Sequence, residues 1–167
     1  DNFMNPLKTF GFVVSSLLIS GTTSATMLSG GLNVDNGYVA YLSTLDNTQG
    51  QQISAGQHWP TTYTFADINL SAGQDYFLHI YAYDMGWIAG FLGDFSLTGG
   101  DHTFANGQTS LTTNTTDWAV STIGWQDYKQ TQSLGSNGVS PWGTRAGIAS
   151  SAEWIWSADA YNDNTNY

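Results

Sequence analysis

Three tryptophans in loop contexts are the residues of this 167-residue sequence best placed for chemistry. They are Trp59, which precedes a proline, Trp125, and Trp142, which follows a proline. Exposed aromatic rings stack on the C–H faces of sugars, while a few polar side chains meet the hydroxyl groups. Arg145 follows Trp142 closely and could hold a sugar hydroxyl or carboxylate. The competing interpretation is structural, because loop tryptophans also fold back as plugs and Arg145 could pair with an aspartate.

A calcium site is the second candidate, because aspartates and asparagines cluster at two places. Asp159 and Asp163 lie in one loop with two asparagines, and Asp35 directly precedes Asn36. Calcium takes about 6 to 8 oxygen ligands from side chains and carbonyl groups. The spacing does not match an EF-hand loop, and a solvated acidic surface is the alternative explanation. We therefore expect no required cofactor and regard a structural calcium ion as a candidate.

The sequence lacks the usual catalytic signatures. His58, His79 and His102 do not stand in a metal-ligand spacing, and the chain has no cysteine. Neither a Gly-x-Ser-x-Gly elbow nor a phosphate-binding loop with lysine occurs. His79 lies among aromatic residues in a strand-like run, where a packed histidine is the expected role. Glu153 is the single glutamate, and no aspartate stands out as its partner for glycoside hydrolysis. We therefore expect a protein that is not an enzyme.

The charge balance excludes nucleic acid as an ordinary partner. The sequence has 13 acidic and 3 basic residues, a formal net charge of −10. Nucleic-acid binding needs a lysine and arginine surface that neutralises phosphates. Nearly all the acids are aspartates, which favour turns and caps over helix interiors. Together with 19 glycines, this composition predicts an all-β protein with many turns.

Residues 4–25 have the three parts of a secretory signal peptide. Lys8 gives a positive start, residues 10–19 are apolar, and small residues lead to Ala25. The apolar stretch is about half the roughly 20 residues that a membrane-spanning helix needs. We predict cleavage after Ala25, and no transmembrane span in the mature chain. Residues 1–25 are then upstream residues and signal peptide, residues 26–167 form a single domain, and the protein is secreted or held at the cell surface.

The rest of the sequence reads as short strands separated by turns. Residues 37–43, 61–67 and 74–83 are rich in strand formers, and another strand is expected over 87–97. Residues 74–83 have apolar or aromatic side chains on both faces, which predicts a central strand covered on both sides. Turn signals recur at the spacing typical of a sandwich or barrel.

Several motifs resemble the galactose-binding-domain-like jelly-roll family of secreted bacterial proteins, including members with a PEP-CTERM sorting tail. The resemblance covers residues 32–167 and has an Asp-Asn turn before a strand, a Gly…Trp step, a Leu-x-x-Gly turn before a long strand, and a closing Trp-Ile-Trp strand. These motifs are Val34-Asp35-Asn36-Gly37-Tyr38, Gly56…Trp59, Leu70-Ser71-Ala72-Gly73, Ser140-Pro141-Trp142-Gly143 and Trp154-Ile155-Trp156. The resemblance implies an all-β jelly-roll β-sandwich. It also implies one further strand and any sorting tail beyond Tyr167.

The combined expectation is a secreted or cell-surface, non-enzymatic β-sandwich module that binds carbohydrate. Its partners would be glycans or extracellular matrix polysaccharide. Two alternatives stay open, a purely structural or adhesive extracellular domain and an accessory domain of a larger glycoside hydrolase. Exposure of Trp59, Trp125 and Trp142 separates the first two, because a binding platform needs exposed rings.

Overall fold

The computed structural model describes residues 24–158 and 160, and these residues form strands and loops without a helix. The expected all-β class is therefore confirmed for this part of the chain. The segment expected to be a signal peptide lies outside the described residues up to position 23, and β1 begins at Thr26. The strands are β1 (Thr26–Asp35), β2 (Gly37–Ser43), β3 (Gln51–Gly56), β4 (Tyr63–Leu70), β5 (Phe77–Tyr83), β6 (Gly90–Thr98), β7 (Ser110–Thr112), β8 (Ala119–Val120), β9 (Lys129–Gln130), β10 (Gln132–Ser136) and β11 (Glu153–Trp156).

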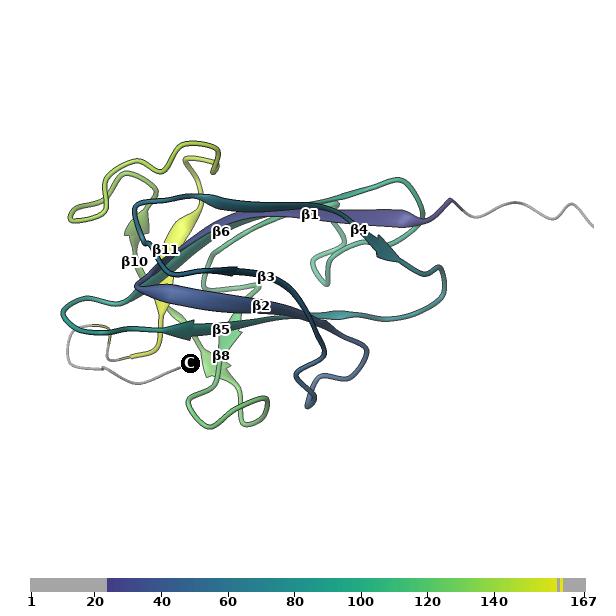
Figure 1. Cartoon of the computed structure of the whole chain (residues 1–167), viewed down its shortest axis with the longest axis horizontal. Helices are drawn as coiled ribbons and strands as arrows, with labels where there is room; N and C mark the ends of the chain where they lie inside the picture. Colours follow the sequence, from purple (N-terminus) through teal and green to yellow (C-terminus); the bar gives the residue numbers. More distant parts are fainter. Residues whose placement is uncertain (1–23, 159, 161–167) are drawn as a thin grey trace, which may run out of the picture.

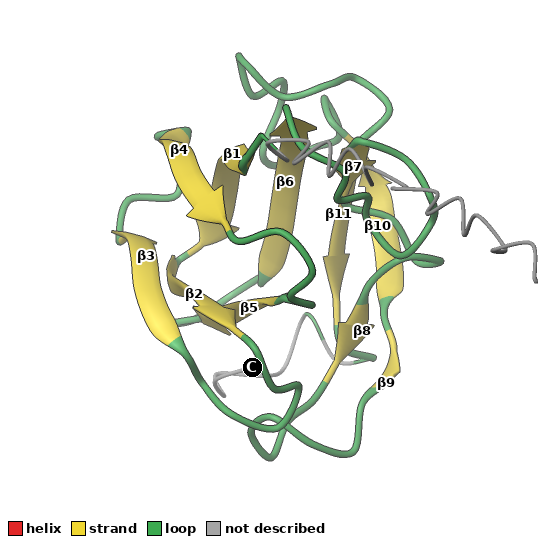
Figure 2. Ribbon diagram, turned by 90° about the vertical axis from the view of Figure 1, so that its right-hand side faces the viewer, coloured by secondary structure: helices red, strands yellow, loops and turns green. Residues whose placement is uncertain are grey.

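Two sheets face each other and enclose the core, an arrangement consistent with a β-sandwich (Figures 1 and 2). The larger sheet has the order β10-β11-β6-β1-β4, with β7 paired to β6. The smaller sheet has the order β3-β2-β5, and β8 and β9 form a separate hairpin. All of these pairs are antiparallel. The longest pairing joins β1 to β6 over nine residue pairs, from Met27↔Thr98 to Asp35↔Gly90.

One expectation about strand position is wrong. The pattern of residues 74–83 predicts a central strand, but β5 is the last strand of the smaller sheet. Its side chains are apolar or aromatic on both faces because Leu78 and Ile80 pack on the core, while His79 on the other face stacks on Trp125. The strand expected from position 87 begins only at Gly90, so Trp87 lies in the preceding loop.

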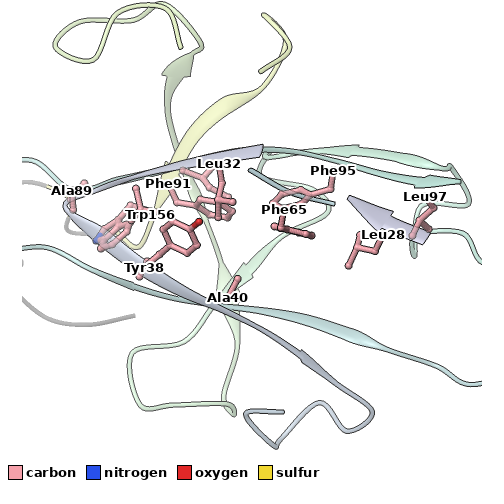
Figure 3. Packing of buried hydrophobic residues seen from close by; sticks show 14 of the residues in the cluster. Leu28, Leu32, Tyr38, Ala40, Phe65, Ala89, Phe91, Phe95, Leu97 and Trp156 are labelled. Atoms are coloured by element: carbon pink, nitrogen blue, oxygen red, sulfur yellow. The ribbon is translucent and has the colours of Figure 1, made fainter. Parts of the chain in front are cut away.

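The core between the sheets is built largely from aromatic and branched side chains (Figure 3). Leu32 of β1, Tyr38 of β2 and Phe95 of β6 are fully buried in it. Trp156 of β11 also belongs to this core, whereas Trp154 belongs to a second cluster on the outer side of the larger sheet. Ile155 belongs to the core between the sheets and its neighbour Trp154 to the second cluster, and adjacent residues of a strand point to opposite faces, so this short strand supports both clusters. No helix of the described residues is long and apolar enough to span a membrane.

Candidate functional site

Trp142 lies in the second cluster and not at the surface. Its side chain is 2% exposed, and its ring stacks on Trp154 with centroids 4.4 Å apart and an interplanar angle of 16°. The indole Nε1 donates a hydrogen bond of 2.9 Å to Oδ2 of Asp35. The ring offers no exposed face to a sugar, which corrects the expectation of a surface platform here. We therefore leave Trp142 out of the candidate binding site.

Trp59 and Arg145 lie together, and their contacts connect the loop after β3 to the 140s loop. The Arg145 guanidinium lies 5.4 Å from the centroid of the Trp59 ring. Its Nη1 donates to the carbonyl of Pro60 at 3.2 Å, and its Nη2 donates to the carbonyl of Trp142. The expected alternative of an aspartate partner does not hold among the described residues, where no carboxylate forms an ion pair with Arg145. With both terminal nitrogens donating to carbonyl groups, Arg145 joins the 140s loop to the loop after β3.

Of the three aspartates expected at a calcium site, the structure places only Asp35. Asp159 and Asp163 lie outside the described residues. Asp35 ends β1 and is buried, and burial raises the pKa of its carboxyl group. The hydrogen bond from Trp142 opposes this rise in pKa, whereas the neighbouring carboxylate of Asp84 adds to it. Among the described residues, no three acidic or histidine side chains converge as a metal cluster.

A largely apolar cavity lies at the open edge of the smaller sheet, between β5 and the β8–β9 hairpin. We call it the β5 pocket. Its volume is about 270 Å3, and its floor is Phe91, Ile155 and Trp156. Residues 78–82 of β5 form one wall, and residues 118–121 form the other. Consecutive residues of β5 line the pocket because it runs along the edge of that strand, where no further strand pairs.

The β5 pocket contains a buried histidine whose hydrogen-bonding groups are unused. His79 is 6% exposed, and neither of its ring nitrogens has a hydrogen-bond partner. The nearest charged group is Asp46, with Oδ1 3.6 Å from Nε2 of His79, too far for a good hydrogen bond. Burying a polar group without a partner costs free energy, so such a group in a cavity wall favours a ligand that supplies the missing bond.

Trp125, the third predicted tryptophan, does line the β5 pocket. It is half-buried and stacks on His79, with ring centroids 4.6 Å apart and an interplanar angle of 13°. Its ring also meets Tyr41 edge to face at 6.1 Å. Trp125 therefore closes the pocket from the side of the 120s loop and holds the imidazole between aromatic neighbours, since Phe77 lies 6.3 Å away on the same strand face.

Tyr128 ties the loop that carries Trp125 to the smaller sheet. Its hydroxyl group donates to the backbone carbonyl of Asp46 at 3.1 Å. Burial raises the pKa of the Tyr128 phenol, and the negative charge of Asp46 adds to the rise. The phenol therefore stays protonated at neutral pH and keeps its role as a donor. This bond connects the 120s loop to the loop between β2 and β3.

Sequence reasoning missed most of the residues in this pocket. His79 is expected as a packed histidine, and it also lines the cavity. Trp118 lines the cavity as well and packs edge-on against Phe91 at 5.1 Å. The one available signal was a polar residue within the otherwise apolar run of β5. Trp87, expected in a strand, is instead 90% exposed in the loop before β6.

Comparisons with known proteins add no assignment to this geometry. The chain matches no family model, and neither the curated proteins nor the solved structures give a significant match. The resemblance of its motifs to the galactose-binding-like family therefore stays a prediction.

Proposed function

We propose that this chain is a non-enzymatic β-sandwich module, secreted or held at the cell surface, that binds a carbohydrate in the β5 pocket. The observation that carries the proposal is that aromatic walls and the buried, unpartnered imidazole of His79 line the same cavity. Small-molecule sites have this composition, mostly apolar and aromatic with a few polar groups that fix orientation. The proposed extracellular location rests on the amino-terminal pattern of a signal peptide.

The size of the pocket limits the ligand. Its volume of about 270 Å3 is just below the roughly 300 Å3 at which typical small-molecule sites begin. One sugar ring fits such a space, whereas an internal segment of a polysaccharide needs a groove open at both ends. The ligand is therefore a monosaccharide or the terminal residue of a glycan. Its C–H groups pack on the aromatic walls around Trp125, and a hydroxyl group hydrogen-bonds to His79.

The strand pairing supports a jelly-roll type for this sandwich. β1 pairs with β6 and β2 pairs with β5, so the pairs are nested along the chain, and β3 leads to β4 in the opposite sheet. Nested antiparallel pairs divided over two sheets are the pattern of a jelly roll. We propose this type on the pairing alone, and the galactose-binding-like family on the motifs alone.

A structural or adhesive role is the second candidate function. It is favoured by the burial of three of the seven tryptophans, which serve packing in the core. These are Trp142, Trp154 and Trp156. In this case the β5 pocket is an imperfection in the packing at a sheet edge. An accessory domain of a glycoside hydrolase would bind carbohydrate in the same pocket, and it would differ from a separate binding module only in being joined to a catalytic domain.

Binding of methyl glycosides tests the proposed function directly. We expect one or more of a panel of common hexose methyl glycosides to bind at millimolar concentration, with changes in tryptophan fluorescence and saturation transfer in NMR. Trp125→Ala should weaken binding about tenfold, since a stacked ring contributes roughly 0.5–1.5 kcal/mol beyond its buried area. Trp87→Ala, the same substitution at an exposed ring outside the pocket, should bind as the wild type does.

The panel includes cyclohexanol, which has the size of a sugar ring but only one hydroxyl group. Binding of cyclohexanol without binding of any glycoside would show an apolar cavity and reject the carbohydrate proposal. Equal binding of a glycoside by the wild type and Trp125→Ala would place the sugar elsewhere. Thermal unfolding of each variant is measured first, so that lost binding is not mistaken for lost structure.

A further inference from the structure

Two carboxylates are buried side by side at one end of the sandwich, away from the β5 pocket lining. Asp35 is 7% exposed at the end of β1, and Asp84 is 4% exposed directly after β5. Both oxygens of Asp84 are buried and have no hydrogen-bond partner. Burying an ionised carboxylate is costly unless it is paired, and a second carboxylate beside it increases the cost.

The backbone fixes the two aspartates next to each other. β2 pairs with β5 so that Gly37 faces Tyr83, and the amide of Asn36 donates to the Tyr83 carbonyl at 2.9 Å. The amide of Met85 donates to Oδ1 of Asn36 at 2.6 Å. These bonds join the β1–β2 turn to the loop after β5 on both sides of Asp84. The position of its carboxylate beside Asp35 therefore follows from strand register and two hydrogen bonds.

The described part of the chain offers no positive side chain to this pair. Lys129 pairs with Asp127 at 3.7 Å, and Arg145 bonds to backbone carbonyls. Asp35 has one partner, the Trp142 indole at Oδ2, which leaves its charge uncompensated. Burial raises the pKa of the Asp35 carboxyl group, and the neighbouring carboxylate of Asp84 raises it further. Among the described residues no cation neutralises the pair, so a cation from solution would relieve the repulsion.

We propose that Asp35 and Asp84 bind a calcium ion between the β1–β2 turn and the loop after β5. Two carboxylates balance the charge of a divalent cation, and oxygen is the ligand that calcium prefers. Backbone carbonyls and water would complete its coordination. Calcium is favoured over magnesium because it accepts irregular oxygen geometry, whereas magnesium usually keeps several of its waters. The partner residue Asp84 is not foreseen by the sequence, where only Asp35 is a candidate of the two.

The ion would connect the two sheets at this end of the domain. Asp35 belongs to the larger sheet through its pairing with Gly90, and Asp84 continues an edge strand of the smaller sheet. A ligand that binds only the folded state stabilises it in proportion to the logarithm of its concentration over the dissociation constant. Calcium should therefore raise the midpoint of thermal unfolding. Because the site does not involve His79 or Trp125, this result is independent of sugar binding.

Thermal unfolding of the full chain tests the site, because the order of stability of the wild type and Asp84→Asn should differ between chelator and calcium. In chelator, Asp84→Asn should be at least as stable as the wild type, because it removes one of two repelling charges. In millimolar calcium, the wild-type midpoint should rise by several degrees and the Asp84→Asn midpoint should stay unchanged. Asp75→Asn, the same substitution at an exposed aspartate, should respond to calcium as the wild type does. Magnesium at the same concentration should have a smaller effect.

Terbium luminescence gives a second measurement that does not depend on unfolding. The Trp142 indole contacts Asp35, so excitation of tryptophan should sensitise terbium bound at this site. We expect saturable emission that calcium displaces and that both Asp84→Asn and Asp35→Asn abolish. An unchanged wild-type midpoint in calcium would overturn the proposal. A calcium shift that survives in both variants would overturn it as well, because the ion would then bind elsewhere.

Discussion

Replacing Trp142 by alanine is expected to lower the free energy of unfolding by about 3–5 kcal/mol, the range found for large aromatic side chains in cores. The substitution removes a fully buried ring and its stacking on Trp154. It also removes the donor that satisfies Oδ2 of Asp35, which would then be a buried acceptor without a partner. For a domain with a total stability of about 5–15 kcal/mol, this loss is large.

The measurement is urea unfolding followed by far-ultraviolet circular dichroism, which does not depend on the number of tryptophans left. Trp87→Ala is the matched control, because Trp87 is 90% exposed. Substitutions at exposed positions usually change stability by less than about 0.5 kcal/mol. The two variants therefore make the same chemical change at opposite extremes of burial.

The same pair of variants separates the two interpretations of Trp142. A core residue loses stability and leaves glycoside affinity unchanged in the protein that still folds. A sugar platform would show the reverse, a loss of less than about 1 kcal/mol in stability, well below the core range, together with weaker glycoside binding. The second result would contradict the buried position of the ring and would return Trp142 to the binding site.

Strands with a clear local pattern could be predicted from the sequence, whereas strand neighbours could not. The runs that became β2, β4 and β5 were expected within a few residues, because alternation and strand formers are local signals. β1 was not expected, since Gly30 and Gly31 interrupt its pattern. The position of β5 at a sheet edge depends on pairing with β2 across about forty residues, and apolar side chains on both faces do not encode that position.

The roles of the candidate site residues were even harder to predict from the sequence than the strand neighbours. Trp125 was expected at a binding site from its loop context, and it does line the β5 pocket. Trp142 has a similar loop context but is buried, where its ring stacks on Trp154 and its indole donates a hydrogen bond to Asp35, 107 residues away. Asp84 lies beside Asp35 only through the β2–β5 register. In each case a partner distant in sequence determines the role, and one sequence alone does not reveal that partner.

The glycine pair of β1 provides the second large prediction, because its two members meet opposite surroundings. A methyl group at Gly30 would lie 2.5 Å from Cδ1 of Phe95 and 2.9 Å from Cζ of Phe65. At Gly31 the nearest atoms are methyl groups of Thr62 and Thr64 at 3.7 Å, which is ordinary contact. The aromatic rings of the core therefore occupy the space beside Gly30, whereas the other face of the strand has room for a methyl group at Gly31.

Gly30→Ala is expected to destabilise the domain by about 1–3 kcal/mol, the cost of overpacking a core that must shift two rings. Gly31→Ala should be neutral or stabilise by up to about 1 kcal/mol, because alanine restricts the unfolded chain and fits the folded one. Both are compared with the wild type by urea unfolding under the same conditions. Equal effects of the two substitutions would contradict the close approach of Phe95 to β1. A selective loss at Gly30 would explain why an interior strand of the larger sheet carries a residue that weakens the local strand pattern.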